Sequence, residues 1–346
     1  MTDRRPRHKG SISNKVADRV LRSASRSWTT EPSRRRARSC RPVDSRVRAR
    51  DVSAVRIVSF VRDGHPGIGV LSGDRIVDAR SALGDGYSRD LRLVLADPER
   101  TLESLRKLED AAGDFEIDEV TLLPVVQRPE KILCVGLNYD AHRVETGREA
   151  SNHPVLFTRF ASTLIGHGRP ILRPLASAKL DYEGELAVII GQRGRRVPVE
   201  RALDLVAGYT CFNDASIRDW QRHTHQFTPG KNFPSTGALG PWLVTRDAIA
   251  DPQALGLRTR LNGEEVQSGH TSQMIFPVRY LIHYITQFCE LVPGDVIATG
   301  TPSGVGYRRS PPVYLGPGDV VEVDIEGVGC LRNPVVDEVS AEEASR

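Results

Sequence analysis

Short runs of alternating apolar and polar residues begin at Ala54 and predict β-strands. Residues 55–61 (VRIVSFV) and 67–71 (GIGVL) form two such runs, separated by Asp63-Gly64. Alternation with a period of two places apolar side chains on one face of a strand, and Asp-Gly is a turn sequence. The pattern predicts a β-meander, followed by a helical stretch between about residues 88 and 112. Together they indicate a small N-terminal α/β domain over residues 53–128.

A second region begins at Lys131 and is rich in predicted strands. We interpret as strands the apolar runs at 132–135, 186–190, 242–244, 296–298 and 320–323. A helix is predicted over 278–290, where apolar residues recur at helical spacing. Strands and helices do not alternate regularly, as they do in Rossmann and TIM folds. We therefore expect an α+β fold that is predominantly β, with the second domain at 129–340 and a short tail at 341–346.

Residues 1–52 differ from the rest of the chain in charge. The first 50 residues hold 16 Lys and Arg against 4 Asp and Glu, so the remainder carries a net charge of about −8 although the whole chain is +4. The segment has too few apolar residues to offset the entropy of ordering, which predicts disorder. Three explanations stay open: an organelle transit peptide, a nucleic-acid-binding tail, and a start codon assigned too far upstream. We favour the third. Met1 and Met274 are the only methionines, so a true start near Val52 would have to be a non-Met codon.

Cysteine spacing and hydropathy bear on the compartment. The 5 cysteines lie far apart, and none forms a Cys-x-x-Cys pair typical of zinc sites. No run of apolar residues approaches the length of a membrane span, and the N-terminus lacks the apolar segment of a secretion signal. We expect a cytoplasmic protein with reduced thiols, and we expect the globular body to bind neither membrane nor nucleic acid.

Acidic residues stand at the ends of two apolar strands and predict a metal site. Glu183 and Glu185 lie two residues apart in LDYEGELAVIIG (180–191), so they share a face of the strand, and Asp214 ends the apolar run GYTCFND (208–214). Buried carboxylates that lie side by side repel one another unless a cation neutralises them. Oxygen ligands suit Mg²⁺ or Mn²⁺, with Ca²⁺ as a further candidate. The first pair is equally typical of an exposed strand end with two solvated acids.

Three further segments carry candidate chemistry. In GLNYDAHRVE (136–145), His142 and Glu145 share a helical face after an Asn138 cap, so the carboxylate could orient the imidazole as a general base; a surface ion pair is the alternative. Lys231 in PGKNF (229–233) is a candidate for binding a substrate carboxylate or an oxyanion; a solvated charge in a loop is the alternative. The Gly-rich run 299–306 offers backbone N–H groups to an anion but lacks the ending of a nucleotide P-loop. We interpret His223 and His225 as surface or lid residues.

Taken in order, these motifs and PGDVIATGTPSGVG (293–306) resemble the fumarylacetoacetate hydrolase superfamily over most of residues 131–335. The resemblance implies a C-terminal catalytic domain with a mixed β-roll, a homodimer, and Mg²⁺ or Mn²⁺ in the site. It assigns three groups of residues. They are the metal ligands Glu183, Glu185 and Asp214, the catalytic residues His142, Glu145 and Lys231, and the substrate contacts Arg218, Gln221 and Thr301. The chain departs from many relatives at Arg159-Phe160, where they read Lys-Pro, and at 223–228.

The function that we expect is hydrolysis of a carbon–carbon bond in an acylpyruvate-like diketo acid. In this mechanism Glu145 orients His142, which activates water, while Lys231 and the metal stabilise the enolate that leaves. The alternative keeps the site but needs no attack by water: a decarboxylase or isomerase of an oxo-tricarboxylate, an unsaturated oxo acid or oxaloacetate. A nucleic-acid-binding protein that uses the Arg-rich leader is a rival from another class.

Overall fold

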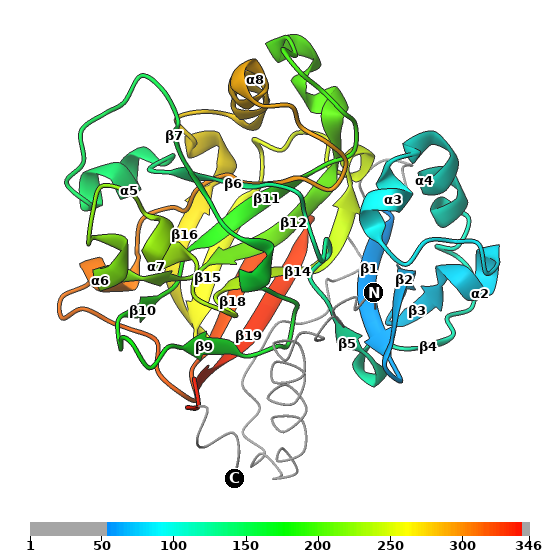
Figure 1. Ribbon diagram of the computed structural model, residues 1–346, viewed down its shortest axis with the longest axis horizontal. Helices are drawn as coiled ribbons and strands as arrows, with labels where there is room; N and C mark the ends of the chain where they lie inside the picture. The colour runs from blue at the N-terminus through cyan, green and yellow to red at the C-terminus, as the bar shows by residue number, and fades with distance from the viewer. Residues whose placement is uncertain (1–53, 341–346) are drawn as a thin grey trace, which may run out of the picture.

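The computed structural model describes residues 54–340, except the side chains of residues 98–101. The leader predicted at 1–52 and the tail at 341–346 lie outside the described residues. The described chain is mostly β-sheet, which confirms the predicted fold class (Figure 1).

The N-terminal region is the predicted meander. It consists of β1 (Arg56–Arg62), β2 (His65–Ser72) and β3 (Arg75–Asp78), with Ile57 opposite Val70 in the antiparallel register. Asp63 and Gly64 both have positive φ, at 49° and 80°, which suits the tight turn between β1 and β2. The short helix α2 (Ala79–Leu83) follows.

The single helical stretch predicted at 88–112 is wrong in its continuity. The chain forms two short helices instead, α3 (Leu91–Leu95) and α4 (Pro98–Arg106). Pro98 begins the second helix, and a proline disfavours helical backbone at the residue before it. Asp97 accordingly has φ −128° and ψ 73°, outside the helical region, and separates the two helices.

A 12-stranded sheet joins the N-terminal region to the rest of the chain. Its strand order is β4-β3-β2-β1-β14-β12-β11-β17-β6-β7, with β5 beside β1 and β8 beside β14. The junction is the antiparallel pair of β1 with β14 (Gly237–Thr245), in which Arg56 lies opposite Val244. The boundary predicted near residue 128 stays a prediction, because the sheet is continuous across it. The other strands of this sheet are β4 (Phe115–Glu116), β5 (Thr121–Leu122), β6 (Ile132–Gly136), β7 (Val155–Thr158), β8 (Leu164–Ile165), β11 (Gly184–Ile190), β12 (Val206–Asp214) and β17 (Val296–Ala298).

A five-stranded sheet in the order β16-β15-β18-β19-β9 packs against the large sheet. The core between them includes Leu186 and Val188 of β11, Leu257 of β15 and Val323 of β18, all almost fully buried. Helix α8 (Val278–Phe288) adds Leu281, Ile282 and Ile285 to this core, as its predicted apolar face requires. The strands are β9 (Ile171–Arg173), β15 (Gly256–Leu261), β16 (Glu264–His270), β18 (Val320–Ile325) and β19 (Gly329–Asp337).

The remaining elements are short, and α5, α6, α7 and β10 lie together on the left of Figure 1. Strands β10 (Leu180–Asp181) and β13 (Ser216–Ile217) pair with each other. Three helices follow buried strands or turns: α5 (Asp140–Glu145), α6 (Arg218–Gln221) and α7 (Thr228–Lys231). The 3-10 helices are η1 (Ile117–Glu119), η2 (Ala161–Thr163), η3 (Val199–Leu205), η4 (Arg246–Ala248), η5 (Thr271–Gln273) and η6 (Gly306–Arg308).

Candidate active site

Three buried carboxylates meet where β11 begins and β12 ends. Gly184 lies opposite Asn213 in the antiparallel pair, and the backbone N–H of Asp214 donates to the carbonyl of Glu183 at 2.9 Å. This register brings Asp214 beside Glu183 and Glu185, which share one face as predicted. The three side chains offer ligand oxygens that lie within 4.8 Å of one another. All three residues are buried, so the alternative of solvated acids at an exposed strand end is wrong.

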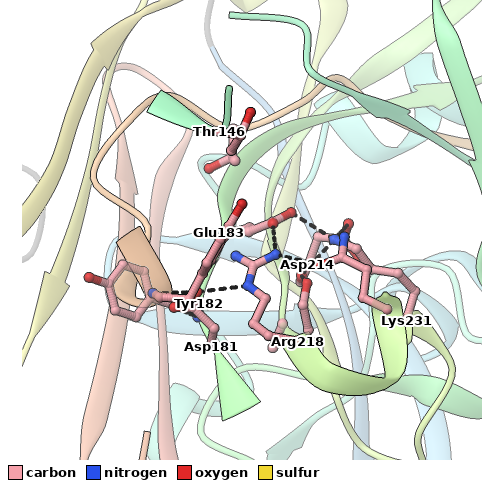
Figure 2. A network of polar contacts seen from close by, with 12 residues as sticks. Thr146, Asp181, Tyr182, Glu183, Asp214, Arg218 and Lys231 are labelled. Carbon is pink, nitrogen blue, oxygen red and sulfur yellow. Dashed lines mark hydrogen bonds and ion pairs between the residues drawn. The ribbon is translucent and has the colours of Figure 1, made fainter. Parts of the chain in front are cut away.

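Three buried cations neutralise most of this charge, and Figure 2 shows two of them, Lys231 and Arg218. The ammonium of Lys231 lies 2.7 Å from Glu183 Oε2 and 2.5 Å from Asp214 Oδ2. Arg218 lies 2.8 Å from Asp181 Oδ2 and 2.5 Å from Glu183 Oε1. The third cation, Arg159, pairs with Asp214 Oδ1.

The formal charge of the cluster is nevertheless negative. Four carboxylates, including Asp181, face three cations, which leaves one negative charge in excess. Glu185 has no cation within salt-bridge distance among the described residues. Its Oε2 accepts only the N–H of Gly300, at 2.9 Å.

The pKa shifts follow this distribution of charge. Burial by itself raises the pKa of Glu183, but the cations of Lys231 and Arg218 outweigh burial and hold the pKa at about 2. Burial, together with the neighbouring Asp214 and Glu183 carboxylates, raises the pKa of Glu185 well above its usual range. Burial lowers the pKa of Lys231, yet Asp214 and Glu183 raise it above the ordinary value. Lys231 is therefore a charged ammonium at neutral pH and donates hydrogen bonds.

The acidic cluster fits a divalent cation. A protein ammonium already bridges Glu183 and Asp214, so these oxygens face a position that binds positive charge. Glu185, which has no cation partner among the described residues, lies beside them, and all three donors are the hard oxygens that Mg²⁺ and Mn²⁺ prefer. The residues that would hold the ion are Glu183, Glu185 and Asp214.

A His-Glu pair lies on α5. His142 Nδ1 is 3.2 Å from Glu145 Oε2, while Glu145 Oε1 accepts the N–H of Gly304 at 3.0 Å. Glu145 is thus held from two sides and fixes the ring of His142. His142 is buried and its Nε2 has no hydrogen-bond partner among the described residues. The predicted alternative, a pair on the exposed surface, is wrong for His142.

Asn138 does not cap α5, contrary to the sequence prediction. The residue at the cap position is Tyr139, which makes no capping hydrogen bond through its side chain. Asn138 is fully buried and its amide donates to the carbonyls of Phe276 and Thr299, at 3.0 and 2.8 Å. The side chain therefore ties the entry of α5 to two distant segments of the chain.

The Gly-rich loop 299–306 binds the protein's own carboxylates. Its N–H groups donate to Glu185 from Gly300, to Glu145 from Gly304 and to Asp181 from Gly306, at 2.9 to 3.0 Å. Gly304 has φ +103°, and a Cβ there would lie 2.2 Å from the carbonyl oxygen of Val266, so glycine is required. The loop was predicted to offer these donors to an anionic ligand; instead it orders the acids of the site.

A cavity of about 290 Å³ opens over these residues. The triad members Glu183 and Glu185, with Lys231, contribute to its lining, and His142 lies in the same cavity. Tyr307 and the arginines 148, 218, 222 and 308 also line it. The acid cluster, the imidazole and a set of cations are therefore open to one and the same ligand.

Residues 131–336 match the family model described as "Fumarylacetoacetate (FAA) hydrolase C-terminal". The matched segment is more than half of the chain. The chain belongs to the fumarylacetoacetate hydrolase family. This result confirms the resemblance inferred from the motifs.

Individual relatives of this family agree in extent and in fold. The chain is 39% identical to "Oxaloacetate tautomerase fahd2, mitochondrial" of Xenopus laevis over 290 residues, which cover 82% of this chain and 91% of that protein. A fumarylacetoacetate hydrolase from psychrophilic Exiguobacterium antarcticum superposes with a TM-score of 0.70 and 37% identity, over 82% of this chain and 100% of that one. Maleylpyruvate hydrolase from Sphingobium sp. SYK-6, in complex with manganese (II) ion and pyruvate, gives 0.69 and 27% with the same coverage.

The structure brings together the residues that the family resemblance assigned. The three assigned substrate contacts, Arg218, Gln221 and Thr301, all line the cavity. Arg218 donates to Gln221 at 3.0 Å, and one of its nitrogens, Nη2, is buried without a hydrogen-bond partner among the described residues. Thr301 lines the cavity, but its hydroxyl donates to the carbonyl of Gly184 at 2.9 Å and accepts from Gln267. These contacts place Thr301 as a residue that fixes β11.

Two charged members of the site were not assigned from the sequence. Asp181 continues the spacing of two residues set by Glu183 and Glu185, which was a usable signal. Its side chain accepts three backbone N–H groups and pairs with Arg218. Arg159 follows β7 and was noted only as a departure from relatives; no local pattern shows that its side chain crosses to Asp214.

Other predictions concern the surface and the compartment. His223 and His225 are exposed, in agreement with their interpretation as surface residues. Among residues 54–340, no helix is long and apolar enough to cross a membrane. The Xenopus relative is named mitochondrial. The cytoplasmic location and the homodimer stay predictions for this chain.

Proposed function

We propose that this protein is a metal-dependent tautomerase of a small 2-oxo acid of the oxaloacetate type. The observation that carries the proposal is that one cavity reaches two carboxylates of a buried acid triad and an imidazole whose Nε2 has no hydrogen-bond partner among the described residues. The choice of reaction rests on the relative named oxaloacetate tautomerase, which this chain matches over 91% of its length. Of the reactions expected from the sequence, the non-hydrolytic alternative is therefore better supported than hydrolysis.

The reaction requires little of the protein beyond proton transfer. In going from the enol to the keto form, the enol O–H bond breaks, a C–H bond forms at the neighbouring carbon, and no other atom is gained or lost. A divalent cation held by Glu183, Glu185 and Asp214 would bind the carboxylate and the adjacent oxygen of the substrate and draw electron density from them.

Residues of the chain supply the remaining steps. The enol O–H proton passes to water, and the charged Lys231 stabilises the negative charge that develops on the substrate oxygen. The buried Nη2–H of Arg218, which has no partner among the described residues, donates to a carboxylate oxygen and orients the acid. His142, held by Glu145 through Nδ1, carries a proton to or from the carbon through Nε2.

A second candidate is hydrolysis of a carbon–carbon bond, the reaction first predicted from the motifs. The fold likeness to maleylpyruvate hydrolase favours it, as does the His142–Glu145 pair, which is suited to activate water. In the hydrolytic reading His142 takes a proton from water, and in the tautomerase reading it exchanges one with the substrate.

One assay separates these reactions. The purified chain, treated with EDTA and then reloaded with Mn²⁺ or Mg²⁺, is mixed with enol-oxaloacetate, and loss of the enol absorbance is followed while NMR identifies the products. We expect metal-dependent acceleration with oxaloacetate left intact. Release of CO₂ and pyruvate would replace the proposal by decarboxylation. Metal-dependent cleavage of acetylpyruvate or fumarylpyruvate, with no effect on oxaloacetate, would replace it by hydrolysis.

A further inference from the structure

The mouth of the cavity carries positive charge that the protein does not neutralise. Arg148, Arg222 and Arg308 line the cavity and have exposed side chains. None of the three has an ion-pair partner among the described residues. The acids that line the cavity are Glu183 and Glu185, and both belong to the buried cluster. We call Arg148, Arg222 and Arg308 the arginine rim.

The rim differs in kind from the buried cations. Lys231 and Arg218 also line the cavity, but each of them lies within 2.7 to 2.8 Å of a carboxylate of the protein. Their charges are therefore largely neutralised by the carboxylates of the protein. Exposed arginines without an ion-pair partner have N–H groups available to a ligand. Arginine binds carboxylates through bidentate hydrogen bonds.

The aromatic ring of Tyr307 lies beside two of the rim arginines and the buried Arg218. The guanidinium carbons of Arg218, Arg222 and Arg308 lie 4.5, 4.3 and 5.3 Å from the centre of the Tyr307 ring. Such distances suit cation–π contacts, which hold these three guanidinium groups around one ring. Because Arg218 and Arg222 share this ring, their guanidinium carbons are less than 9 Å apart. Arg218 in turn contacts Glu183, so a single small ligand can contact both the rim and the acid cluster.

Two members of the rim, Arg148 and Arg308, come from segments far apart in the sequence. Arg308, on the loop after β17, places Nη2 at 3.7 Å from the position that a Cβ on Gly147 would occupy, and Gly147 precedes Arg148. Residues after α5 and residues after β17 therefore bring their positive charges to the same opening. In addition, a divalent cation bound to the four carboxylates and three cations of the buried cluster would give that cluster a formal charge of +1, so the whole cavity would favour an anion with more than one charge.

We propose that the arginine rim binds the second carboxylate of a 2-oxo dicarboxylate and so selects dicarboxylates over 2-oxo monocarboxylates. The inference rests on the proposed function for the position of the first carboxylate and its neighbouring oxygen at the acid cluster. Arg222 and Arg308 are specificity-determining residues that touch the distal carboxylate, with Tyr307 as the residue that positions them.

The test compares two substrates that share the reacting half. Oxaloacetate has the second carboxylate and 2-oxobutanoate has a methyl group in its place. With Mn²⁺-loaded protein, proton exchange at carbon 3 in D₂O is followed by NMR for both. The variants are R222Q, R308Q and the double variant, with R308K to restore the charge. R279Q is the matched control, because Arg279 is an exposed arginine on α8 outside the cavity.

We expect the wild type to prefer oxaloacetate, and the double variant to raise its KM for oxaloacetate about tenfold or more with little change in kcat, as lost charge-assisted contacts require. The KM for 2-oxobutanoate should stay within about twofold. R308K should recover part of the affinity that R308Q loses, and R279Q should behave as the wild type. Added salt should raise the KM for oxaloacetate in the wild type more than in the double variant. Equal losses for both substrates, or a wild type without preference, would overturn the proposal.

Direct binding separates this inference from the proposed reaction. Calorimetric titration of the same proteins with oxaloacetate and 2-oxobutanoate measures the discrimination without turnover. If the protein turns over neither compound but binds oxaloacetate in a rim-dependent manner, the reaction is wrong and the rim stands. If the rim variants leave the Kd for oxaloacetate unchanged, the rim proposal fails whatever the activity.

Discussion

The role of Lys231 gives the sharpest test of the charge balance in the buried cluster. Its ammonium touches Glu183 and Asp214, and the side chain is 1% exposed. The substitution Lys231→Met keeps an unbranched side chain of similar length and removes the charge. The cluster would then hold four carboxylates against two cations, Arg159 and Arg218.

The expected cost follows from the remaining contacts. Removal of one partner from a buried ion pair costs about 3–5 kcal/mol. Glu183 keeps Arg218 and Asp214 keeps Arg159, so we expect the lower end, about 3 kcal/mol of unfolding free energy in EDTA. A divalent cation supplies the missing charge, so in saturating Mn²⁺ the deficit should shrink to about 1 kcal/mol. That recovery of about 2 kcal/mol corresponds to about 30-fold tighter Mn²⁺ binding by the variant.

Urea denaturation with and without Mn²⁺ measures both quantities, and calorimetry measures Mn²⁺ affinity directly. Lys179→Met is the matched control, because Lys179 is exposed and has no ion pair among the described residues. We expect K179M to behave as the wild type and K231M to lose the proposed activity although it binds metal more tightly. A variant that is equally destabilised with and without Mn²⁺, or that binds Mn²⁺ more weakly, would refute the reasoning.

Three further predictions concern single residues of the site. The folded-state pKa of Glu185 is raised above its ordinary 4.5, so its proton stabilises the metal-free protein fully below about pH 4.5, and this contribution is lost as the pH rises through the folded pKa. Mn²⁺ binding should therefore release a proton, seen by calorimetry in buffers of different ionisation enthalpy and absent in Glu185→Gln. His142→Ala should lower kcat about 10²–10⁴-fold with KM nearly unchanged, and Glu145→Gln should lower it less; unchanged kcat in H142A would remove His142 from the mechanism. Arg159→Met should cost about 3 kcal/mol, measured by urea denaturation, because a buried carboxylate of Asp214 loses its partner. Arg159→Lys should recover most of that loss, and equal losses in the two variants would show that the charge is not the cause.

Local patterns were sufficient for much of the fold. The period of two in β1 and β2, and the continuous apolar run in β11, identified these strands, because a strand must bury one face or both. The apolar spacing of α8 likewise identified its buried side. The same reasoning failed at 88–112, where helical composition was interpreted as one helix although Pro98 begins a second. It also failed at Asn138. An Asn before a helix has the same local sequence whether it caps the helix or is buried and donates hydrogen bonds to distant carbonyls.

The sequence by itself determined which residue types are available and which acids share a face. Glu183 and Glu185 lie two apart on a strand, so their common direction follows from backbone geometry alone. Only the tertiary structure decided how their charge is balanced, because Arg159 and Lys231 reach Asp214 from segments 55 and 17 residues away. Coulomb interactions depend on distance through space rather than along the chain. The same reason applies to the arginine rim, whose members come from three separate segments of the chain and share one cavity only after the chain has folded.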